Sequence, residues 1–280
     1  MSILLYAPAK LNLMLHITGQ RADGYHLLET VFQFIELYDH LEFQLTTGTR
    51  VRREPGQTPI PEQEDIVMSA AKLLHSRYRV DAGVNITVEK NIPIGGGLGG
   101  GSSNAATCLL ALNQLWELGL TLDELAGIGL ELGADVPVFI HGKAAWATGI
   151  GECLQVIKLE QPYFLVIHPG IAVSSAQIFR AQELTRNCDA ITIRAFLEGS
   201  GTNVCEPVAC RLYPQIATAI DWLNQHARAR MSGTGACVFA AFDSLEQAEV
   251  VKLQVPQQWT AYVARAMNRN PVHQQLGLQV

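Results

Sequence analysis

The chain has 280 residues, of which 48% are hydrophobic, and a formal net charge of −6 at pH 7. This length exceeds one average domain, so we expect two domains, 1–150 and 151–280. The negative charge argues against a nucleic-acid partner, because nucleic-acid phosphates are bound through clustered Lys and Arg side chains. The chain has no run of about 18 uninterrupted apolar residues, so we expect no membrane contact.

The cysteines carry no recognisable metal or redox motif. They form no CxxC pair and show no metal-type spacing with histidine, which predicts buried, reduced thiols. Reduced thiols are typical of the cytoplasm, where we therefore expect the protein. The cysteines are Cys108, Cys153, Cys188, Cys205, Cys210 and Cys237.

A strand is predicted over residues 3–20, because apolar residues alternate there from Leu11 to Ile17. Lys10 and Asn12 share its other face, and Pro8 confines its start to an edge or a bend. Composition alone favours a solvated strand residue at Lys10.

Tyr25 and His26 end a polar turn between two predicted strands. The turn, residues 21–26, contains an Asp-Gly pair, and residues 27–43 resume strand-like character. In such places tyrosine is usually a packing residue and histidine a polar surface residue.

Residues 46–64 are rich in Gly, Pro, Thr, Gln and Glu and are predicted to form a surface loop. A helix is predicted from Asp65, because apolar residues recur there at helical spacing. An alternating strand over residues 84–88 then leads through Lys90 into a glycine-rich segment.

Six glycines lie between Pro93 and Ser102, and an apolar run that predicts a helix starts near Ser102. Without Cβ atoms, the loop can adopt left-handed backbone angles and bring its N–H groups close to a ligand. These amides and the free donors of the helix N-terminus form an anion site that suits a phosphate chain. The predicted site comprises Pro93, Ile94, Gly95, Gly96, Gly97, Leu98, Gly99, Gly100, Gly101, Ser102 and Ser103.

Three other interpretations of this segment are weaker. A flexible linker would not run directly into an apolar helix. A Walker A loop requires a Gly-Lys-Ser/Thr ending, and no lysine lies inside this loop. A dinucleotide fingerprint lacks a convincing acidic residue about 20 residues further on and ranks second among phosphate loops.

A second helix is predicted over residues 122–132, capped by Thr121 or Asp123. Asp135 follows it directly and lies two residues before Pro137. An Asp in this position is equally compatible with a helix cap and with a catalytic carboxylate. The spacing leaves both alternatives open.

The second half alternates helices and strands. Ser174 is predicted to cap a helix that carries Phe179, and a lone Phe on a helix is usually a core residue. Residues 142–151 suggest a hairpin or a domain junction, and residues 231–242 a small-residue turn that feeds a strand. Further strands are predicted over 163–168 and 262–266, and further helices over 191–198, 206–212, 214–229 and 245–253.

Three blocks together resemble the motifs of the kinase superfamily named after galactokinase, homoserine kinase, mevalonate kinase and phosphomevalonate kinase (GHMP kinases). The blocks are residues 8–12, 93–103 and 232–235. The turn 21–26 and the segment 132–138 resemble one branch in particular, which acts on a methylerythritol linked to cytidine diphosphate. The resemblance runs from about residue 6 to residue 242. It implies an α+β, two-domain fold with the active site in the cleft between an N-terminal ATP-binding domain and a C-terminal substrate-binding domain.

The resemblance also implies the activity. Members of this branch use ATP and Mg²⁺ to phosphorylate an erythritol hydroxyl in the non-mevalonate route to isoprenoid precursors, giving the 2-phosphate. Two alternatives stay open: a kinase of another small alcohol, such as mevalonate or homoserine, and a nucleotide-binding sensor without turnover.

Carried over by motif, Lys10 and Asp135 match the catalytic pair of the family, and Asn12 matches a residue of the methylerythritol pocket. Tyr25 and Phe179 correspond to the aromatic residues that stack cytosine, and His26 to the residue that hydrogen-bonds its edge.

The resemblance also implies which residues lie near the bound ATP. Lys90 and Asp65 fall where the family approaches adenosine, and Ser103 is a candidate Mg²⁺ contact by analogy with other phosphate loops. The chain departs from the family at two places. Asp65 stands where Asn is common, and Val204 replaces a usual Asp.

Overall fold

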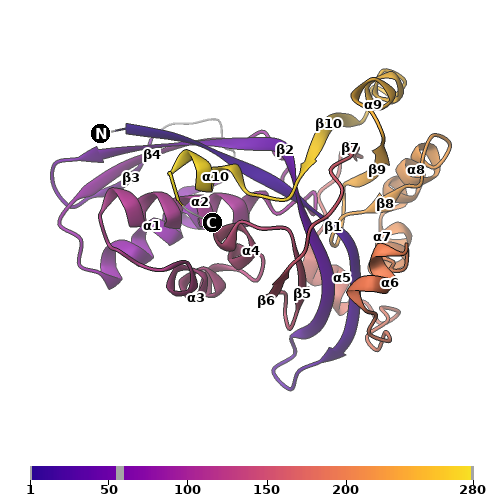
Figure 1. Ribbon diagram of the computed structural model, residues 1–280, viewed down its shortest axis with the longest axis horizontal. Coiled ribbons are helices and arrows are strands. Elements are labelled where there is room, and N and C mark those ends of the chain that lie inside the picture. Colours follow the sequence, from indigo (N-terminus) through magenta and orange to yellow (C-terminus); the bar gives the residue numbers. More distant parts are fainter. Residues whose placement is uncertain (1, 55–59, 279–280) are drawn as a thin grey trace.

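The computed structural model describes residues 2–54 and 60–278, and one largely antiparallel sheet runs through this part of the chain (Figure 1). Its order is β3-β4-β2-β10-β7-β9-β8; β1 and β5 also pair with β2, and β6 pairs with β5. The parallel pair is β3 with β4. The strands are β1 (Ser2–Gln20), β2 (His26–Thr46), β3 (Val51–Arg53), β4 (Gly83–Glu89), β5 (Ala145–Thr148), β6 (Cys153–Val156), β7 (Tyr163–His168), β8 (Arg230–Met231), β9 (Val238–Phe242) and β10 (Thr260–Met267).

The helices divide into two groups at opposite ends of this sheet (Figure 1). The first group of helices, together with the strands that it covers, is called the first lobe. Its helices are α1 (Ile66–Arg77), α2 (Gly100–Leu115), α3 (Leu122–Leu132), α4 (Val136–His141) and α10 (Pro271–Gln275). The second lobe contains α5 (Ser175–Arg180), α6 (Ile193–Leu197), α7 (Glu206–Leu212), α8 (Pro214–Leu223) and α9 (Leu245–Lys252). The mixture of helices and sheet agrees with the predicted α+β class.

Each lobe has its own hydrophobic core. The largest cluster joins α1 to α4 with β2 and β4, and a second cluster lies under α7, α8 and α9. Leu15 and Ile17 of β1 belong to the second cluster, although they come from the start of the chain. Val272 and Leu276 near the C-terminal end belong to the first cluster. Segments from both ends of the chain therefore tie the lobes together, and the boundary near residue 150 stays a prediction.

The long strands β1 and β2 carry the connection between the lobes. Their pairing shifts register between Pro8 and Ala9 and again between Asn12 and Met14, so the strand is irregular at Pro8. Lys10 lies between these two irregularities and is only 3% exposed. The expectation of a solvated Lys10 is therefore wrong, because the strand is covered on both faces.

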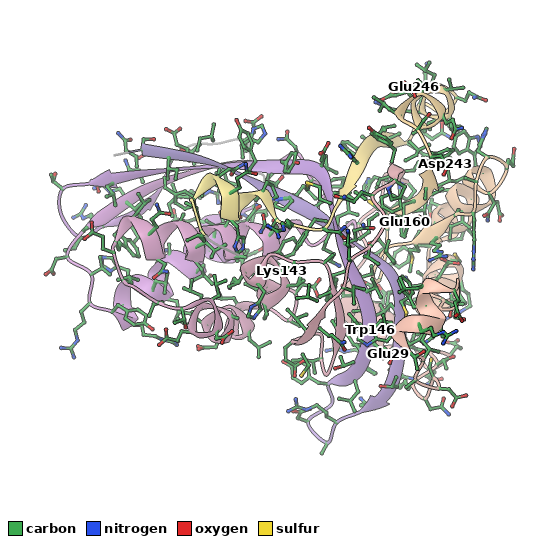
Figure 2. The ribbon with its side chains drawn as sticks, in the orientation of Figure 1. Glu29, Lys143, Trp146, Glu160, Asp243 and Glu246 are labelled. Atoms are coloured by element: carbon green, nitrogen blue, oxygen red, sulfur yellow. The ribbon has the colours of Figure 1, made fainter. Side chains whose placement is uncertain are left out.

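Side chains of β2 and β5 extend this connection (Figure 2). The Glu29 carboxylate accepts a hydrogen bond of 2.9 Å from the backbone N–H of Ile191, and the Trp146 and Phe196 rings form a T-shaped pair with centroids 6.2 Å apart. Both pairs join the central strands to the segment around α6.

Several predicted elements need correction. The loop predicted over 46–64 contains the short strand β3 and a 3-10 helix, Glu62–Glu64, while residues 55–59 lie outside the described part. The helix predicted over 214–229 ends at Leu223, and the one predicted over 191–198 covers only α6. Ser174 precedes α5 but makes no side-chain capping bond, whereas Thr121 caps α3 through a complete capping box.

Candidate active site

A cleft of about 1240 Å³ lies between the two lobes. It is lined at one end by the glycine-rich loop and at the other by the turn before β2 and by α5. Most of the residues predicted for the site line this cleft: Lys10, Asn12, Tyr25, His26, Lys90, Asp135, Phe179 and residues 93–102. Asp65 and Ser103 are not among its lining residues.

The glycine-rich loop packs between β1 and the turn at residues 232–235. Gly95, Gly97 and Gly99 all have positive φ, near 70°. A Cβ on Gly97 would lie 2.3 Å from the Ser232 carbonyl oxygen, so only glycine fits at this approach. The Lys10 N–H donates to the Leu98 carbonyl at 2.9 Å, and the Cys237 N–H donates to the Gly96 carbonyl at 3.0 Å. The loop is therefore held by β1 on one side and by the residues that follow the 232–235 turn on the other.

Lys10 is buried at the floor of the cleft and is surrounded by oxygen atoms. Its Nζ lies 3.1 Å from Asp135 Oδ2 and donates to Asn12 Oδ1 and, at 3.3 Å, to the Gly97 carbonyl. The ammonium also lies 5.3 Å from the centre of the Phe32 ring. This network fixes the cation beside the glycine-rich loop, where a phosphate would be attracted.

Asp135 stands at the N-terminus of α4 without capping it. Its side chain makes no capping hydrogen bond, and Pro137 occupies the first turn. The carboxylate is instead paired with Lys10, and about a third of the side chain (34%) remains exposed to the cleft. Its second oxygen is thus available to a bound ligand.

Asn12 is oriented by Thr30, which the sequence did not indicate, and by Ser232 of the third sequence block. Its Nδ2 donates to Thr30 Oγ1 at 2.9 Å, and its backbone N–H donates to Ser232 Oγ at 3.2 Å. Ser232 Oγ in turn donates to the Gly97 carbonyl at 2.9 Å. The Ser232 side chain therefore links the third sequence block, residues 232–235, to the first block through Asn12 and to the second block through Gly97.

Lys90 pairs with the buried carboxylate of Asp39, which also accepts the backbone N–H groups of Asn91 at 2.7 Å and Ile92 at 2.8 Å. Lys90 Nζ lies 3.3 Å from the position that a Cβ on Gly100 would take. The cation thus sits beside the start of α2. No sequence signal identified Asp39, because it comes from β2 and is distant in the chain from Lys90.

Asp65 and Ser103 are both buried. Asp65 caps α1, since its Oδ1 accepts the Val67 N–H at 2.9 Å, and its Oδ2 lies 3.3 Å from Arg53 Nη1. Its neighbour Ile66 lines the cleft. Ser103 lies in the first turn of α2, and within the described residues its Oγ has no hydrogen-bond partner.

The far end of the cleft is built around a stacked pair of rings. The His26 and Phe179 rings have centroids 5.2 Å apart and an interplanar angle of 22°. Arg186, which the sequence did not single out, donates from Nε to His26 Nε2 at 3.1 Å. Tyr25 is 59% exposed on the rim. Burial and, secondarily, the Arg186 charge lower the pKa of His26.

The turn that contains Val204 packs against β1. The Leu15 carbonyl accepts the Val204 N–H at 2.9 Å, and Asn203 Nδ2 donates to the Gly233 carbonyl at 2.7 Å. Val204 itself packs against the core of the second lobe. The turn therefore supports the residue 232–235 segment of the site.

Comparison with known proteins identifies the family. The family described as "GHMP kinases N terminal domain" matches residues 65–143, and "GHMP kinases C terminal" matches residues 181–261. A 4-diphosphocytidyl-2-C-methyl-D-erythritol kinase of Nitrosococcus oceani is 52% identical over 262 residues, covering 94% of each chain. A protein of the same name from Alcanivorax borkumensis is 49% identical and covers 99% of this chain and 95% of the relative. The chain belongs to the 4-diphosphocytidyl-2-C-methyl-D-erythritol kinase family, within the GHMP kinases.

Solved structures agree with this assignment. A crystal structure of 4-(cytidine 5'-diphospho)-2C-methyl-D-erythritol kinase superposes with a TM-score of 0.84 at 30% identity, covering 94% of this chain and 99% of the other. A mevalonate kinase of Methanococcus jannaschii has a TM-score of 0.71 at 16% identity, covering 96% and 99%, which shows a shared fold alone. The predicted two-domain GHMP-kinase-like fold is confirmed, and the protein is an ATP-dependent small-molecule kinase.

Two further observations bear on this kinase. Within the described residues, no group of three or more His, Cys, Asp and Glu side chains is arranged to hold a metal ion. In the same part of the chain, no helix is long and apolar enough to cross a membrane.

Proposed function

We propose that the protein transfers the γ-phosphoryl group of ATP to a hydroxyl of 4-diphosphocytidyl-2-C-methyl-D-erythritol, giving the 2-phosphate, in the non-mevalonate route to isoprenoid precursors. One observation carries the proposal: the Lys10–Asp135 ion pair lines the same cleft as the glycine-rich loop and the His26–Phe179 ring pair. A donor phosphate and an acceptor alcohol could thus meet at that pair.

The ATP phosphates would bind to the glycine-rich loop. The loop offers backbone N–H groups without side-chain obstruction, and the N-terminus of α2 adds its dipole. Lys90, held by Asp39, would contribute a fixed positive charge near the same helix end. Asp65 is proposed to support the adenosine end through its neighbour Ile66, since its own carboxylate is engaged in the α1 cap and the pair with Arg53.

The chemical step needs positioning and charge neutralisation more than covalent help. The bond from the γ-phosphorus to the bridging oxygen of ADP breaks, and a new bond forms to the oxygen of the alcohol. The exposed oxygen of Asp135 would orient that hydroxyl and accept its proton. The Lys10 ammonium would offset negative charge on the phosphoryl group during transfer.

The acceptor substrate would span the rest of the cleft. Asn12 is held next to Lys10 and would contact the methylerythritol portion. The base would stack with Tyr25 and Phe179, and His26 would hydrogen-bond its edge. A cleft that carries these three residues as well as Asp135 suits a long substrate rather than a small alcohol.

Mg²⁺, when bound together with ATP, would supply positive charge that offsets the charge of the phosphates. Ser103 is its proposed protein contact, because its hydroxyl lies in the first turn of α2 and has no hydrogen-bond partner within the described residues. The remaining ligands would be phosphate oxygens and water. We also propose a cytoplasmic location without a nucleic-acid or membrane partner, supported by six free cysteines and the net charge of −6.

A coupled ADP-release assay tests the function against its alternatives. With the cytidine-linked alcohol the protein should release ADP with a kcat/KM at least about 100-fold above that for mevalonate or homoserine, because only the former reaches the ring-lined end. Comparable use of a small alcohol would favour a different acceptor. Absence of ADP release with all three alcohols would favour a sensor without turnover.

A further inference from the structure

Arg186 joins the two elements that build the ring-lined end of the cleft. Its Nη2 donates to the carbonyls of Phe179 at 2.9 Å and Ala181 at 2.7 Å, and its Nη1 donates to the Leu184 carbonyl at 3.1 Å. Its Nε donates to His26 Nε2 at 3.1 Å. Four of the five guanidinium N–H groups are thus committed to fixed acceptors. The side chain connects the C-terminal end of α5 to the first residue of β2.

The hydrogen bond to His26 determines where the imidazole proton lies. A guanidinium remains protonated and has donors only, so the His26 Nε2 atom must present its lone pair. An imidazolium has no such lone pair. His26 is therefore neutral in this arrangement and carries its proton on Nδ1, which has no hydrogen-bond partner within the described residues.

This proton position has a consequence for the base. The free polar atom of the His26 ring is a donor. Cytosine has an unprotonated ring nitrogen on its hydrogen-bonding edge, where uracil carries a proton. A fixed donor on His26 would pair with the ring nitrogen of cytosine. With uracil it would face another donor, which leaves buried groups unpaired.

We propose that Arg186 is a positioning residue for pyrimidine selectivity: it holds His26 in the tautomer that donates from Nδ1, so that the cleft accepts cytosine and rejects uracil. The proposal rests on the proposed function for the relevance of the base. Its structural part, the tautomer, stands on the contacts of Arg186 alone.

The tautomer can be measured directly on the unmodified full-length protein. Long-range ¹H–¹⁵N spectra of the histidine rings, with His26 assigned by its loss in His26→Gln, should show a protonated Nδ1 and an unprotonated Nε2 at about pH 8. Arg186→Met should shift His26 toward the Nε2-protonated form. A protonated Nε2 in the unmodified protein would overturn the proposal.

Selectivity is then measured by binding of cytidine 5′-diphosphate and uridine 5′-diphosphate, which requires no turnover. The unmodified protein should prefer the cytidine nucleotide by at least about tenfold. Arg186→Met should reduce this preference at least about threefold, while Arg186→Lys should give an intermediate value. Arg194→Met, which alters an exposed arginine on α6, should leave the preference unchanged.

The outcomes separate this proposal from the proposed function. An unchanged preference in folded Arg186→Met and Arg186→Lys would overturn the positioning role even if the protein phosphorylates its substrate. Conversely, the expected tautomer and nucleotide preference without ADP release would keep the role of Arg186 and refute the kinase assignment.

Discussion

At the scale of single residues, Asp135 is the group on which the proposed chemistry depends. Asp135→Asn keeps the size of the side chain and removes its charge and basicity. We expect kcat to fall about 100- to 10,000-fold while the KM for ATP stays within a few-fold, because the glycine-rich loop is untouched. Steady-state ADP release measures both constants.

The matched control is Asp123→Asn, at a side chain that is 94% exposed on α3. It should leave kcat unchanged. Near-normal turnover by Asp135→Asn would mean that Asp135 only supports the local structure.

Asp65 presents two roles that can be separated. Because its carboxylate caps α1, Asp65→Ala should lower the free energy of unfolding by about 1 kcal/mol or more, whereas Asp65→Asn preserves a capping oxygen and should cost less. Denaturant unfolding measures this difference. If the position also approaches adenosine, Asp65→Asn should maintain or improve the KM for ATP. Equal destabilisation by both substitutions would argue against the capping role.

At the scale of elements, the glycine-rich loop requires glycine at specific points rather than flexibility. Gly97→Ala would place a methyl group 2.3 Å from the Ser232 carbonyl oxygen at a φ of +74°. We expect the free energy of unfolding to fall by at least about 2 kcal/mol and ATP binding to weaken. Urea unfolding and nucleotide titration measure these two effects.

Gly127→Ala is the matched control. Gly127 lies within α3, and a Cβ there meets no atom within 4 Å. Alanine should therefore leave ATP binding intact and stabilise the protein by up to about 1 kcal/mol. Equal effects of the two substitutions would contradict the close packing of the loop.

The elements also show what the sequence could predict. Strand β7 and helix α3 have the predicted bounds, because an apolar run that ends at Pro169-Gly170 in one and a cap followed by a stop at Gly133 in the other are local signals. Strand β3 was missed because it is only three residues long and lies in a polar segment. Its strand conformation depends on its pairing with β4. Helix α10 was missed because it is one short turn that is held by packing on the first lobe.

Residues of the site could be predicted from the sequence where a local motif marks them. The glycine-rich loop stands out in the sequence as an anion site, whereas the resemblance to GHMP kinases was needed to interpret both Lys10 and Asp135. Asp39 and Arg186 were missed because their partners lie far away in the chain: Lys90 is 51 residues from Asp39, and His26 is 160 residues from Arg186. Such pairings follow from the topology, which no local pattern encodes.

At the scale of the whole molecule, stability should fall as the pH drops below about 6.5. Burial lowers the pKa of four histidines: His16, His26, His168 and His273. In this window the unfolded chain binds more protons than the folded one, so acid favours unfolding. Burial raises the pKa of Glu206, so this carboxyl favours the folded state as the pH falls. It is a single group that opposes four histidines.

We expect Tm to be lower at pH 5.5 than at pH 7.5 by at least about 2 °C. Calorimetry at constant ionic strength measures the shift. An equal or higher Tm at pH 5.5 would show that the four imidazoles are not held neutral by the fold.

In the proposed reaction, the two lobes bring ATP to the alcohol end of a cytidine-linked substrate. This reaction is tested most directly by ³¹P NMR of a mixture of the protein, ATP, Mg²⁺ and 4-diphosphocytidyl-2-C-methyl-D-erythritol. We expect one new phosphomonoester signal on the erythritol, with the cytidine diphosphate signals retained and ADP formed in equal amount. Release of inorganic phosphate without a new ester, or a new phosphate on the cytidine end, would contradict it.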